Sequence, residues 1–358
     1  MTTTFIDAGD REAVDREITG LREWSPLGLD VAVAYGGLSA EDRLYLDKSP
    51  VDQLSVTALR EALTALGAEV RVLDPTAPGF VAHLAGPRVD VVLPNLHGPF
   101  GEDGRLQGLL DYLRVPYCGS GVPACALAAD KILCKEYMRG LGVPTPEWRE
   151  WAGTDQVLDW RGPVMVKPPL GGSSVGMSLV DDPDDFARAL LEAAETDPSP
   201  APRVLVEEVI TGTPVTVGLL ELPGGVLVFP PLATEVGAGQ WYDAETKLDA
   251  AGEGMVSVSA ADLPAKTVRA LTAHARTLWE RLGCRGMARV DFMVDADGHA
   301  FGLEVNPTPG MSVGSNFAAG AGLCGISHAD TVRAVLHEAM TRHTYDVPLS
   351  AEPLLIAG

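Results

Sequence analysis

The amino-acid sequence predicts a mixed α/β protein, in which an N-terminal doubly wound domain with a parallel sheet precedes two α+β domains. Two observations lead to this fold class. Between residues 29 and 120, apolar runs typical of buried strands alternate with segments of helical spacing. After the proline-rich segment 142–148, the pattern changes to pairs of strands separated by glycine-containing turns. We expect binding sites where these units meet.

The expected N-terminal elements follow the chain in order. Residues 1–28 look like a polar leader with a short helix at most. The N-terminal α/β domain covers residues 29–120, with strands expected at 29–35, 68–74 and 89–95 and helices at 51–67 and 104–113.

Two further domains are expected after residue 120. The central domain, residues 121–214, begins with one long helix at 122–142, which ends at a glycine before the proline-rich hinge. Strands then flank a glycine-serine loop, and a helix at 184–195 leads to another strand. The C-terminal domain, residues 215–346, is predicted to contain four strands, a helix at 265–283 and a closing helix near 326–342, followed by a tail at 347–358.

Composition excludes several classes of function. The chain has 358 residues, of which 46% are hydrophobic and 21% charged, as is typical of a soluble globular enzyme. Its net charge of −22 repels nucleic acid and anionic membranes. No apolar run reaches the length of a membrane span, and the acidic start lacks the features of a signal peptide, so we expect a cytoplasmic protein. The five cysteines lack CxxC spacing, which favours reduced thiols over disulfides or a zinc site.

A glycine-serine loop is the first motif that carries chemistry. In KPPLGGSSVG, residues 167–176, backbone N–H groups and serine hydroxyls can donate to phosphate oxygens. The GxxxxGK[ST] pattern is absent and a strand, not a helix, is expected after the loop, so a helix-dipole phosphate site is disfavoured. We expect a hairpin loop that closes over phosphates; an ordinary hairpin turn would leave Lys167 unexplained.

A second motif places acidic side chains together on two strands. Side chains alternate in a strand, so Arg289 and Asp291 share one face, as do Glu304 and Asn306. If the two strands pair through the turn at 295–300, the two carboxylates and the amide converge. Oxygen ligands without histidine or cysteine suit Mg²⁺, which usually also binds phosphate oxygens. An exposed hairpin with scattered acids is the alternative.

Six segments follow the order found in one known family. They are GGLSAE (36–41), NLHGPFGEDGRLQG (95–108), CGSGVPACALAADK (118–131), VMVKPPLGGSSVGMS (164–178), RGMARVDFMVDADG (285–298) and EVNPTPGM (304–311). Together they resemble the D-alanine–D-alanine ligase family over residues 30–345. The resemblance implies an ATP-grasp fold whose two later domains clasp a nucleotide. It also implies a reaction in which ATP phosphorylates the carboxylate of one amino acid and the amine of a second attacks the acyl phosphate.

The resemblance also assigns roles to single residues. Lys131 and Lys167 would contact ATP phosphates, as would Lys247 from the loop at 241–247, and Glu207 would lie at the adenine edge. The full set implied for ATP is Lys131, Lys167, Ser174, Glu207, Glu208 and Lys247. Asp291, Glu304 and Asn306 would hold two Mg²⁺ (or Mn²⁺) ions.

The implied amino-acid site has two parts. Glu41 would hold the ammonium of the first amino acid, with His97 nearby and Ser173 orienting Glu41. Arg289 and the backbone N–H of Gly310 would stabilise the tetrahedral oxyanion. Ser315 would bind the carboxylate of the second amino acid, although Ser312 is an alternative. Simpler interpretations stay open, because His97 could be a core histidine, Glu41 a first-turn helix residue and Lys247 a solvated charge.

Four positions depart from the family's pattern. Leu248 replaces a tyrosine whose hydroxyl, in the family, bonds to the equivalents of Glu41 and Ser173. Asn316 replaces a leucine beside the second substrate, and Pro214 replaces an acid that holds the ribose. Tyr45 replaces a serine near the first substrate. Without the tyrosine hydroxyl, either the loop closes by apolar packing or Tyr45 supplies the missing group. These changes surround the substrates and the ribose, so they bear on the substrate more than on the reaction.

Three hypotheses follow. The first is a D-alanine–D-alanine ligase for cell-wall (peptidoglycan) precursors, the second a relative that joins a different amino-acid pair, and the third a nucleotide-binding pseudoenzyme. A complete set of phosphate and metal residues disfavours the third, and GGLSAE is not the GxGxxG of a Rossmann dehydrogenase. We expect small amino-acid substrates and a homodimer.

Overall fold

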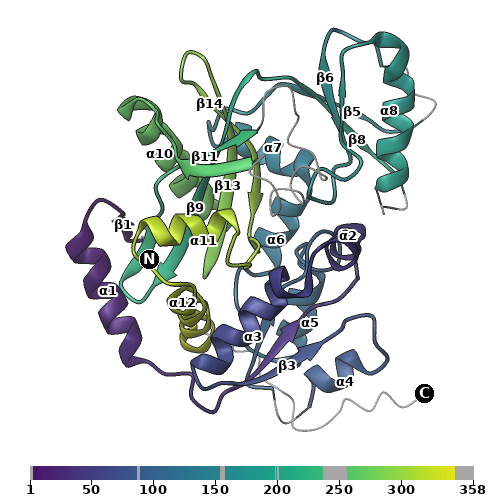
Figure 1. The fold of residues 1–358 in the computed structure, drawn as a ribbon. Coiled ribbons are helices and arrows are strands. Elements are labelled where there is room, and N and C mark those ends of the chain that lie inside the picture. The colour runs from purple at the N-terminus through teal and green to yellow at the C-terminus, as the bar shows by residue number, and fades with distance from the viewer. Residues whose placement is uncertain are drawn as a thin grey trace, which may run out of the picture.

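The computed structural model describes residues 3–86, 89–153, 158–197, 199, 201–236 and 256–342. These residues form three sheets, each packed with helices (Figure 1). The mixed α/β fold class predicted from the sequence is confirmed. Within the described part of the chain, no helix is both long and apolar enough to cross a membrane.

The N-terminal sheet is parallel, as predicted. Its strand order is β3-β2-β4, so the first strand in sequence lies in the centre. The strands are β2 (Asp30–Ala34), β3 (Glu69–Leu73) and β4 (Val91–Pro94), and the helices around them are α2 (Ala40–Lys48), the 3-10 turn η1 (Val51–Gln53), α3 (Ser55–Ala65), α4 (Phe80–Leu84) and α5 (Arg105–Leu113). The sequence patterns predicted the three strands, α3 and α5 but did not identify α2.

The segment 122–142, expected as one helix, forms two. Helix α6 (Val122–Ala129) ends at Asp130, whose backbone is extended, and α7 (Lys131–Gly140) begins directly after it. The Asp130 side chain accepts hydrogen bonds from the backbone N–H groups of Ile132 and Leu133, so it caps α7. The break therefore places Lys131 in the first turn of a new helix.

The central sheet is antiparallel with the order β5-β8-β6-β7. It has its own core, in which α8 (Pro183–Thr196) covers one face through Phe186, Ala189 and Leu190. The strands are β5 (Trp148–Trp151), β6 (Val164–Lys167), β7 (Ser178–Val180) and β8 (Val204–Glu208). The glycine-serine loop, residues 168–177, connects β6 to β7 as the sequence predicted.

The C-terminal sheet has seven strands and is the largest. Strand β9 (Gly212–Leu222) pairs with three others and crosses the expected domain boundary at residue 214. The remaining strands are β1 (Phe5–Asp7), β10 (Gly225–Val228), β11 (Leu232–Val236), β12 (Val256–Ala260), β13 (Met287–Asp295) and β14 (Ala300–Asn306). Helices α6, α7 and α10 (Ala265–Leu282) share a core with this sheet.

Residues 3–28 are part of the folded body, whereas a polar leader was expected over residues 1–28. Strand β1 pairs in parallel with β10, and α1 (Arg11–Glu23) packs against α12 (His328–Thr341). The buried residues Val14, Ile18 and Leu21 of α1 recur at helical spacing among charged neighbours. This short apolar stripe indicates an amphipathic helix packed on the protein, but the many charged residues around it made the segment look like a polar leader.

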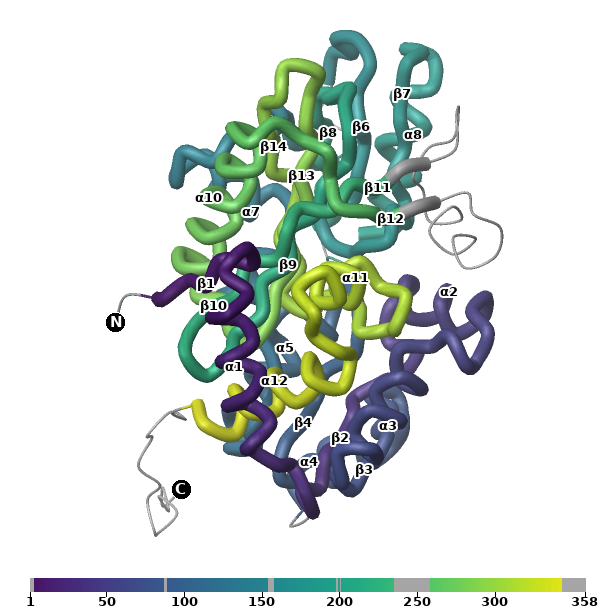
Figure 2. Tube along the Cα trace, turned by 60° about the vertical axis from the view of Figure 1, so that its left-hand side comes forward, coloured from purple at the N-terminus to yellow at the C-terminus, as the bar shows by residue number. Residues whose placement is uncertain are grey.

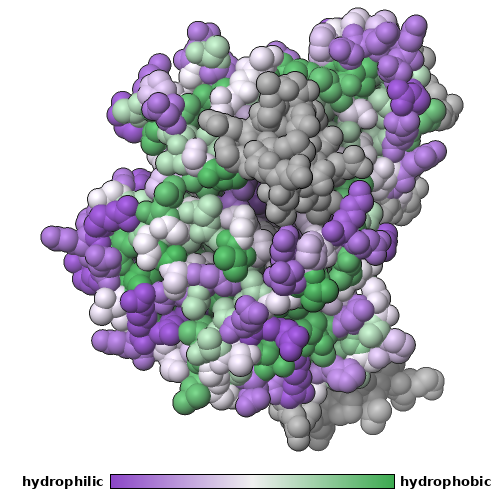
Figure 3. All heavy atoms as spheres, in the orientation of Figure 1, coloured by the Kyte–Doolittle hydropathy of each residue, from purple (hydrophilic) through white to green (hydrophobic). Residues whose placement is uncertain are grey.

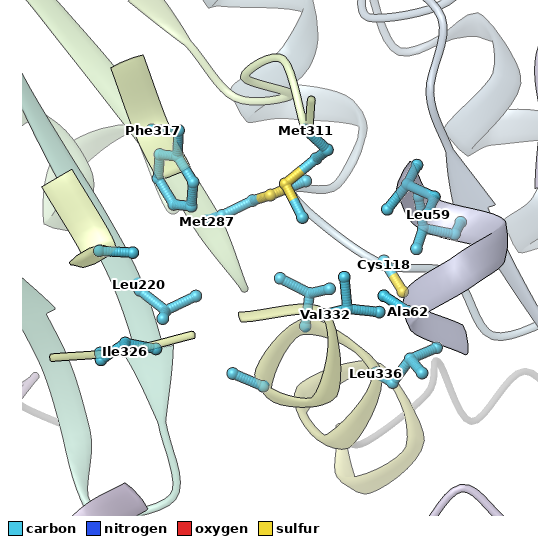
Figure 4. Packing of buried hydrophobic residues seen from close by; sticks show 14 of the residues in the cluster. Leu59, Ala62, Cys118, Leu220, Met287, Met311, Phe317, Ile326, Val332 and Leu336 are labelled. Carbon is cyan, nitrogen blue, oxygen red and sulfur yellow. The ribbon is translucent and has the colours of Figure 1, made fainter. Parts of the chain in front are cut away.

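Helices α11 (Asn316–Leu323) and α12 connect the C-terminal sheet to the N-terminal unit (Figure 2). One continuous apolar cluster spans this junction. Figure 4 shows Met287, Phe317 and Leu220 on the sheet side facing Val332 and Leu336 of α12, with Leu59 and Ala62 beyond them. Hydrophilic side chains gather on the outer faces of α1 and α8 (Figure 3).

Candidate active site

A cavity of about 1490 Å³ lies where the three units meet. This volume exceeds that of most single-ligand pockets and leaves room for a nucleotide together with smaller molecules. The lining comes from every motif that the sequence singled out: α2, the glycine-serine loop, the end of β8, the strands β13 and β14, and residues 308–316.

The acidic strand pair converges as predicted. Strands β13 and β14 are antiparallel, with Asp291 opposite Glu304 and Arg289 opposite Asn306. A bulge follows Asp291 and shifts the register there. Arg289 donates two hydrogen bonds of 2.8 Å to the Asp291 carboxylate, and Asn306 Nδ2 donates one of 2.9 Å to Asp291 Oδ2. The four side chains thus form one polar cluster on the cavity wall.

These residues fit a hard divalent cation. Asp291 and Glu304 face each other in register, and the Asn306 side-chain amide, which contains one further oxygen ligand, is adjacent to Asp291; no histidine or cysteine is among them. The Asp291 carboxylate is occupied by Arg289 and Asn306, so an arriving ion would have to exchange with one of these contacts. Glu304 is partly exposed to the cavity and is the more accessible ligand.

Lys131 connects the acidic strand pair to the glycine-serine loop. Its Nζ lies 3.6 Å from Glu304 Oε2 and also donates to the backbone oxygen of Gly171. The backbone N–H of Lys131 donates to Pro169 O at 2.9 Å. A cation at this position serves both the carboxylate and the loop, in keeping with a phosphate-binding role.

A buried ion cluster lies behind the other predicted phosphate lysine. The Glu207 carboxylate accepts from Lys167 and lies 2.9 Å from Lys135 Nζ. Burial alone would raise the pKa of Glu207, but the two ammonium groups outweigh burial and lower it. Glu207 therefore stays ionised, and its side chain, 4% exposed, is held by lysines at the edge of the cavity.

Helix α2 directs three polar side chains toward the cavity. Ser39 caps the helix by accepting the backbone N–H of Asp42 at 2.9 Å. Glu41 and Asp42 follow in the first turn, where the helix dipole favours negative charge, and Tyr45 lies one turn further on. Glu41 is 8% exposed, which is unusual for a carboxylate in a first helical turn.

Glu41 and Tyr45 both contact the glycine-serine loop. Ser173 Oγ donates to Glu41 Oε1, and the Tyr45 hydroxyl lies 2.8 Å from Ser173 Oγ. A Cβ built on Gly172 would come 2.5 Å from Glu41 Oε2, so any larger residue would displace the carboxylate from its present position. Glu41 Oε2 itself is buried and has no hydrogen-bond partner among the described residues.

His97 is held by Asp42 beside this carboxylate. Asp42 Oδ1 accepts the backbone N–H of His97 at 2.9 Å and lies 3.1 Å from its Nδ1. Burial opposes the charge of His97, but the bond to Asp42 and the neighbouring carboxylates raise its pKa to about 9. Burial and the charge of Glu41 raise the pKa of Glu102 to about 7, although Glu102 accepts the backbone N–H of Gly98.

The far wall of the cavity contains Gly310 and the start of α11. The backbone oxygen of Met311 is 2.8 Å from His328 Nε2 of α12, which fixes the loop around Gly310. Ser315 caps α11 by accepting the Ala318 N–H at 3.2 Å, and Asn316 is the first residue of this helix. Ser312, Ser315 and Asn316 all line the cavity, so both serines considered for the second substrate are present.

The cavity brings together most of the residues selected from the sequence. Ser174, Glu208 and Pro214 also line it, in addition to those above. Lys247 and Leu248 lie outside the described residues.

Sequence reasoning missed three contributors. Asp42 holds His97, Lys135 pairs with Glu207, and Glu102 holds the loop after His97. Lys135 follows Lys131 by four residues on one helix, and Asp42 adjoins Glu41, so both had a spacing signal. Glu102 lies within a quoted motif, but nothing in its spacing distinguishes it from a solvated acid.

Comparisons with known proteins agree with this geometry. The family model described as D-ala D-ala ligase C-terminus matches residues 146–337, and the one described as D-ala D-ala ligase N-terminus matches residues 68–120. A D-alanine--D-alanine ligase of Synechococcus sp. (strain JA-3-3Ab) is 35% identical over 339 residues, which are 91% of this chain and 98% of that protein.

Solved structures also match. The D-alanine--D-alanine ligase from Bacillus anthracis has a TM-score of 0.72 at 27% identity, covering 87% of this chain and 98% of that chain. A structure of the Bacillus anthracis protein complexed with ATP has a TM-score of 0.71 at 24% identity, with the same coverage; at this identity the likeness concerns the fold.

Proposed function

The chain belongs to the D-alanine–D-alanine ligase family, and from this premise we propose that it joins two D-alanine molecules in an ATP-dependent, ADP-forming reaction that supplies cell-wall precursors. One observation carries the proposal. The buried carboxylate oxygen of Glu41, which has no hydrogen-bond partner in the described part of the chain, lines one cavity together with two lysines (Lys131 and Lys167) and the paired acids Asp291 and Glu304.

ATP would lie between the central and C-terminal sheets. Lys131 and Lys167 approach this space from α7 and β6, and the glycine-serine loop offers backbone N–H groups and the Ser174 hydroxyl to phosphate oxygens. We propose Lys247 as a third phosphate contact because its position in the sequence matches that of a phosphate-binding lysine in the family. Glu207, fixed by its lysines, would present its carboxylate edge to the adenine, with Glu208 next to it at the rim.

Asp291, Glu304 and Asn306 would hold Mg²⁺ or Mn²⁺, and two ions are expected. A bound divalent ion would neutralise charge on the β- and γ-phosphates. The chain's own contribution is the position of the ligands, which the register of β13 and β14 fixes at neighbouring points.

The first step transfers the γ-phosphoryl group of ATP to a carboxylate oxygen of the first D-alanine and releases ADP. Glu41 Oε2 would accept the ammonium of this amino acid, because it is buried, unpartnered and adjacent to the loop. Two lysine contacts to phosphates and the Glu41 contact to the ammonium would align the reacting atoms, so positioning supplies much of the rate.

In the second step the amine of the second amino acid, after losing its extra proton, attacks the acyl carbon. The C–N bond forms, the bond to phosphate oxygen breaks, and inorganic phosphate leaves. Arg289 and the backbone N–H of Gly310 would donate to the oxyanion of the tetrahedral intermediate. Ser315, with the N-terminal backbone of α11, would bind the second carboxylate, and Ser312 remains the alternative.

A second candidate function is ligation of D-alanine to a polar amino acid. The observation that favours it is Asn316, which lines the cavity at the start of α11 where the family's pattern has leucine. A polar side chain near the second substrate favours a hydrogen-bonding partner over a methyl group.

The test is release of phosphate with ATP, Mg²⁺ and a panel of D- and L-amino acids, singly and in pairs, with products identified by mass spectrometry. D-Alanyl-D-alanine with ADP and phosphate supports the first candidate, and a mixed dipeptide supports the second. AMP and pyrophosphate as products would exclude the acyl-phosphate mechanism. ATP binding without turnover for every pair would support the pseudoenzyme hypothesis instead.

We also propose that the protein acts in the cytoplasm as a homodimer, as expected from the sequence. Light scattering coupled to gel filtration measures the mass in solution, and fractionation of cells measures the compartment.

A further inference from the structure

We propose that Tyr45 is a positioning residue that holds the glycine-serine loop on the first-substrate site from helix α2. The inference rests on the proposed function, because it names what orders the site of the first amino acid. Three groups form a hydrogen-bonded row: Tyr45 Oη, Ser173 Oγ and Glu41 Oε1.

The direction of these hydrogen bonds is determined by counting protons. A carboxylate has no proton to give, so the bond between Ser173 and Glu41 uses the single hydroxyl hydrogen of Ser173. Ser173 Oγ can then only accept in its contact of 2.8 Å with the Tyr45 hydroxyl. Tyr45 therefore donates to Ser173, and Ser173 donates to Glu41. Each bond in such a chain polarises the next, so the phenol strengthens the contact made by the serine.

The loop needs an external support at this point. Ser173 and Ser174 have φ angles of 48° and 60°, a left-handed conformation that residues other than glycine rarely adopt. Such a conformation persists when contacts around it specify it. On one side Lys131 binds the oxygen of Gly171, and on the other Tyr45 and Glu41 bind Ser173.

Helix α2 is built to deliver both partners. Glu41 and Tyr45 are four residues apart, so they lie on one face of the helix, above each other. The Tyr45 ring lies 5.8 Å from the His97 ring, centroid to centroid, and its hydroxyl lies 2.8 Å from Ser173 Oγ in the loop. The same face thus provides the ligand for the substrate ammonium and the group that closes the loop over it.

This arrangement answers the alternative that the sequence left open. Position 248 carries leucine, which has no hydroxyl, and Tyr45 stands where a serine is typical. In the structure the Tyr45 hydroxyl contacts Ser173, which in turn donates to Glu41. The glycine-serine loop would then be held over the first amino acid by contacts between residues 39–45 and 171–174. These contacts do not require a hydroxyl group at position 248.

The experiment compares Tyr45→Phe, Ser173→Ala and the double variant, with Tyr112→Phe as the control. Phenylalanine keeps the ring beside His97 and removes only the hydroxyl, whereas Tyr112 is 92% exposed on α5. Loss of one hydrogen bond in the chain should raise KM for the first D-alanine about 3- to 10-fold. It should also raise the ratio of phosphate released to dipeptide formed above that of the wild type, because a loosened loop admits water to the acyl phosphate.

The double-mutant cycle separates this role from a general loss of structure. If Tyr45 acts through Ser173, Tyr45→Phe adds less than about a twofold change in the Ser173→Ala background. Equal effects in both backgrounds, or a Tyr45→Phe variant that matches Tyr112→Phe, would overturn the inference while leaving the ligase assignment intact.

A second readout does not depend on turnover. Amide hydrogen exchange at residues 171–176 should be faster in both Tyr45→Phe and Ser173→Ala than in the wild type, and unchanged in Tyr112→Phe. Unchanged exchange in Tyr45→Phe contradicts the inference even if the protein ligates a different pair of amino acids. Absence of ligation by the wild type would contradict the proposed function alone.

Discussion

Lys135 Nζ lies 2.9 Å from Glu207 Oε2, and the Lys135 side chain has no exposed surface. The ammonium also donates to Thr145 Oγ1 at 2.6 Å and lies over the Trp148 ring. Burial lowers the pKa of Lys135, while Glu207 opposes that effect. The lysine is thus a fixed internal cation that sets the position of Glu207 and, through it, of Lys167 at the cavity.

Removing this cation should destabilise the protein. In Lys135→Met, Glu207 keeps one of its two ammonium partners, and we expect a loss on the order of 3 kcal/mol in the free energy of unfolding. Urea unfolding followed by circular dichroism measures it, with the exposed Lys266→Met as the control. Adding Glu207→Gln should recover part of the loss. An equal loss for both lysine variants would show that the buried pair has no special role.

The metal assignment predicts that Glu304→Gln lowers turnover by orders of magnitude without unfolding the protein. The substitution keeps the shape of the side chain and removes a charged oxygen ligand. Steady-state assays across a range of Mg²⁺ concentrations should show a higher requirement for the metal, while the melting temperature changes little. Glu280→Gln, on the exposed face of α10, is the matched control. Near-normal turnover of Glu304→Gln would remove this residue from the metal site.

His97 should make stability depend on pH. Its pKa is raised from 6.5 to about 9 in the folded protein, so the folded state binds this proton more tightly than the unfolded chain does. The resulting stabilisation is complete below pH of about 6.5 and is lost as the pH rises through about 9. Melting temperatures of the wild type and His97→Gln should therefore differ most at the low end of this range. A difference that stays constant or grows toward pH 9 would contradict the assigned charge.

Asp42→Asn provides the control for this prediction. It removes the carboxylate that bonds to His97 and should weaken the pH dependence of the wild-type melting temperature while His97 is still present.

Asn316 should set the preference for the second substrate. In Asn316→Leu, kcat/KM for D-alanine as the amine donor should rise relative to D-serine, because the buried amide no longer needs a polar partner. A single hydrogen bond corresponds to about a 3- to 10-fold change in this ratio. Ser312→Ala and Ser315→Ala, assayed together with it, identify which serine binds the carboxylate. An equal change for both amine donors would place Asn316 outside the second-substrate site.

The sequence predicted those parts of the site that depend on local geometry. Asp291 and Glu304 lie opposite each other because side chains alternate along a strand and a short turn joins the two strands. Both features are determined by residues close together in the sequence. The contact between Tyr45 and Ser173 joins residues 128 positions apart, and no periodicity encodes such a meeting. The same holds for Lys135 and Glu207, whose pairing depends on where α7, packed on the C-terminal sheet, lies relative to β8.

Two elements were mispredicted for reasons that the structure makes clear. The segment 122–142 has continuous helical spacing, but Asp130 bonds to the backbone of the next turn and ends the first helix. In residues 1–28 only three buried apolar side chains on α1 mark the helix, and the charged majority conceals them. Local sequence patterns do not show that a polar side chain such as Asp130 will bond to the backbone and end a helix. They also do not show which short apolar stripes distant segments will bury.

The pairing of β1 with β10 has a consequence for how the chain reaches this fold. Phe5 lies opposite Val226, so β1 is synthesised well before its partner strand, which lies more than two hundred residues later in the chain. Contacts this far apart in sequence slow folding, because a long loop must close before the strand gains its partner. During synthesis, α1 would expose the apolar side chains of Val14, Ile18 and Leu21 until α12 emerges. Strand β1 and helix α1 are therefore expected to dock only after their distant partners have formed.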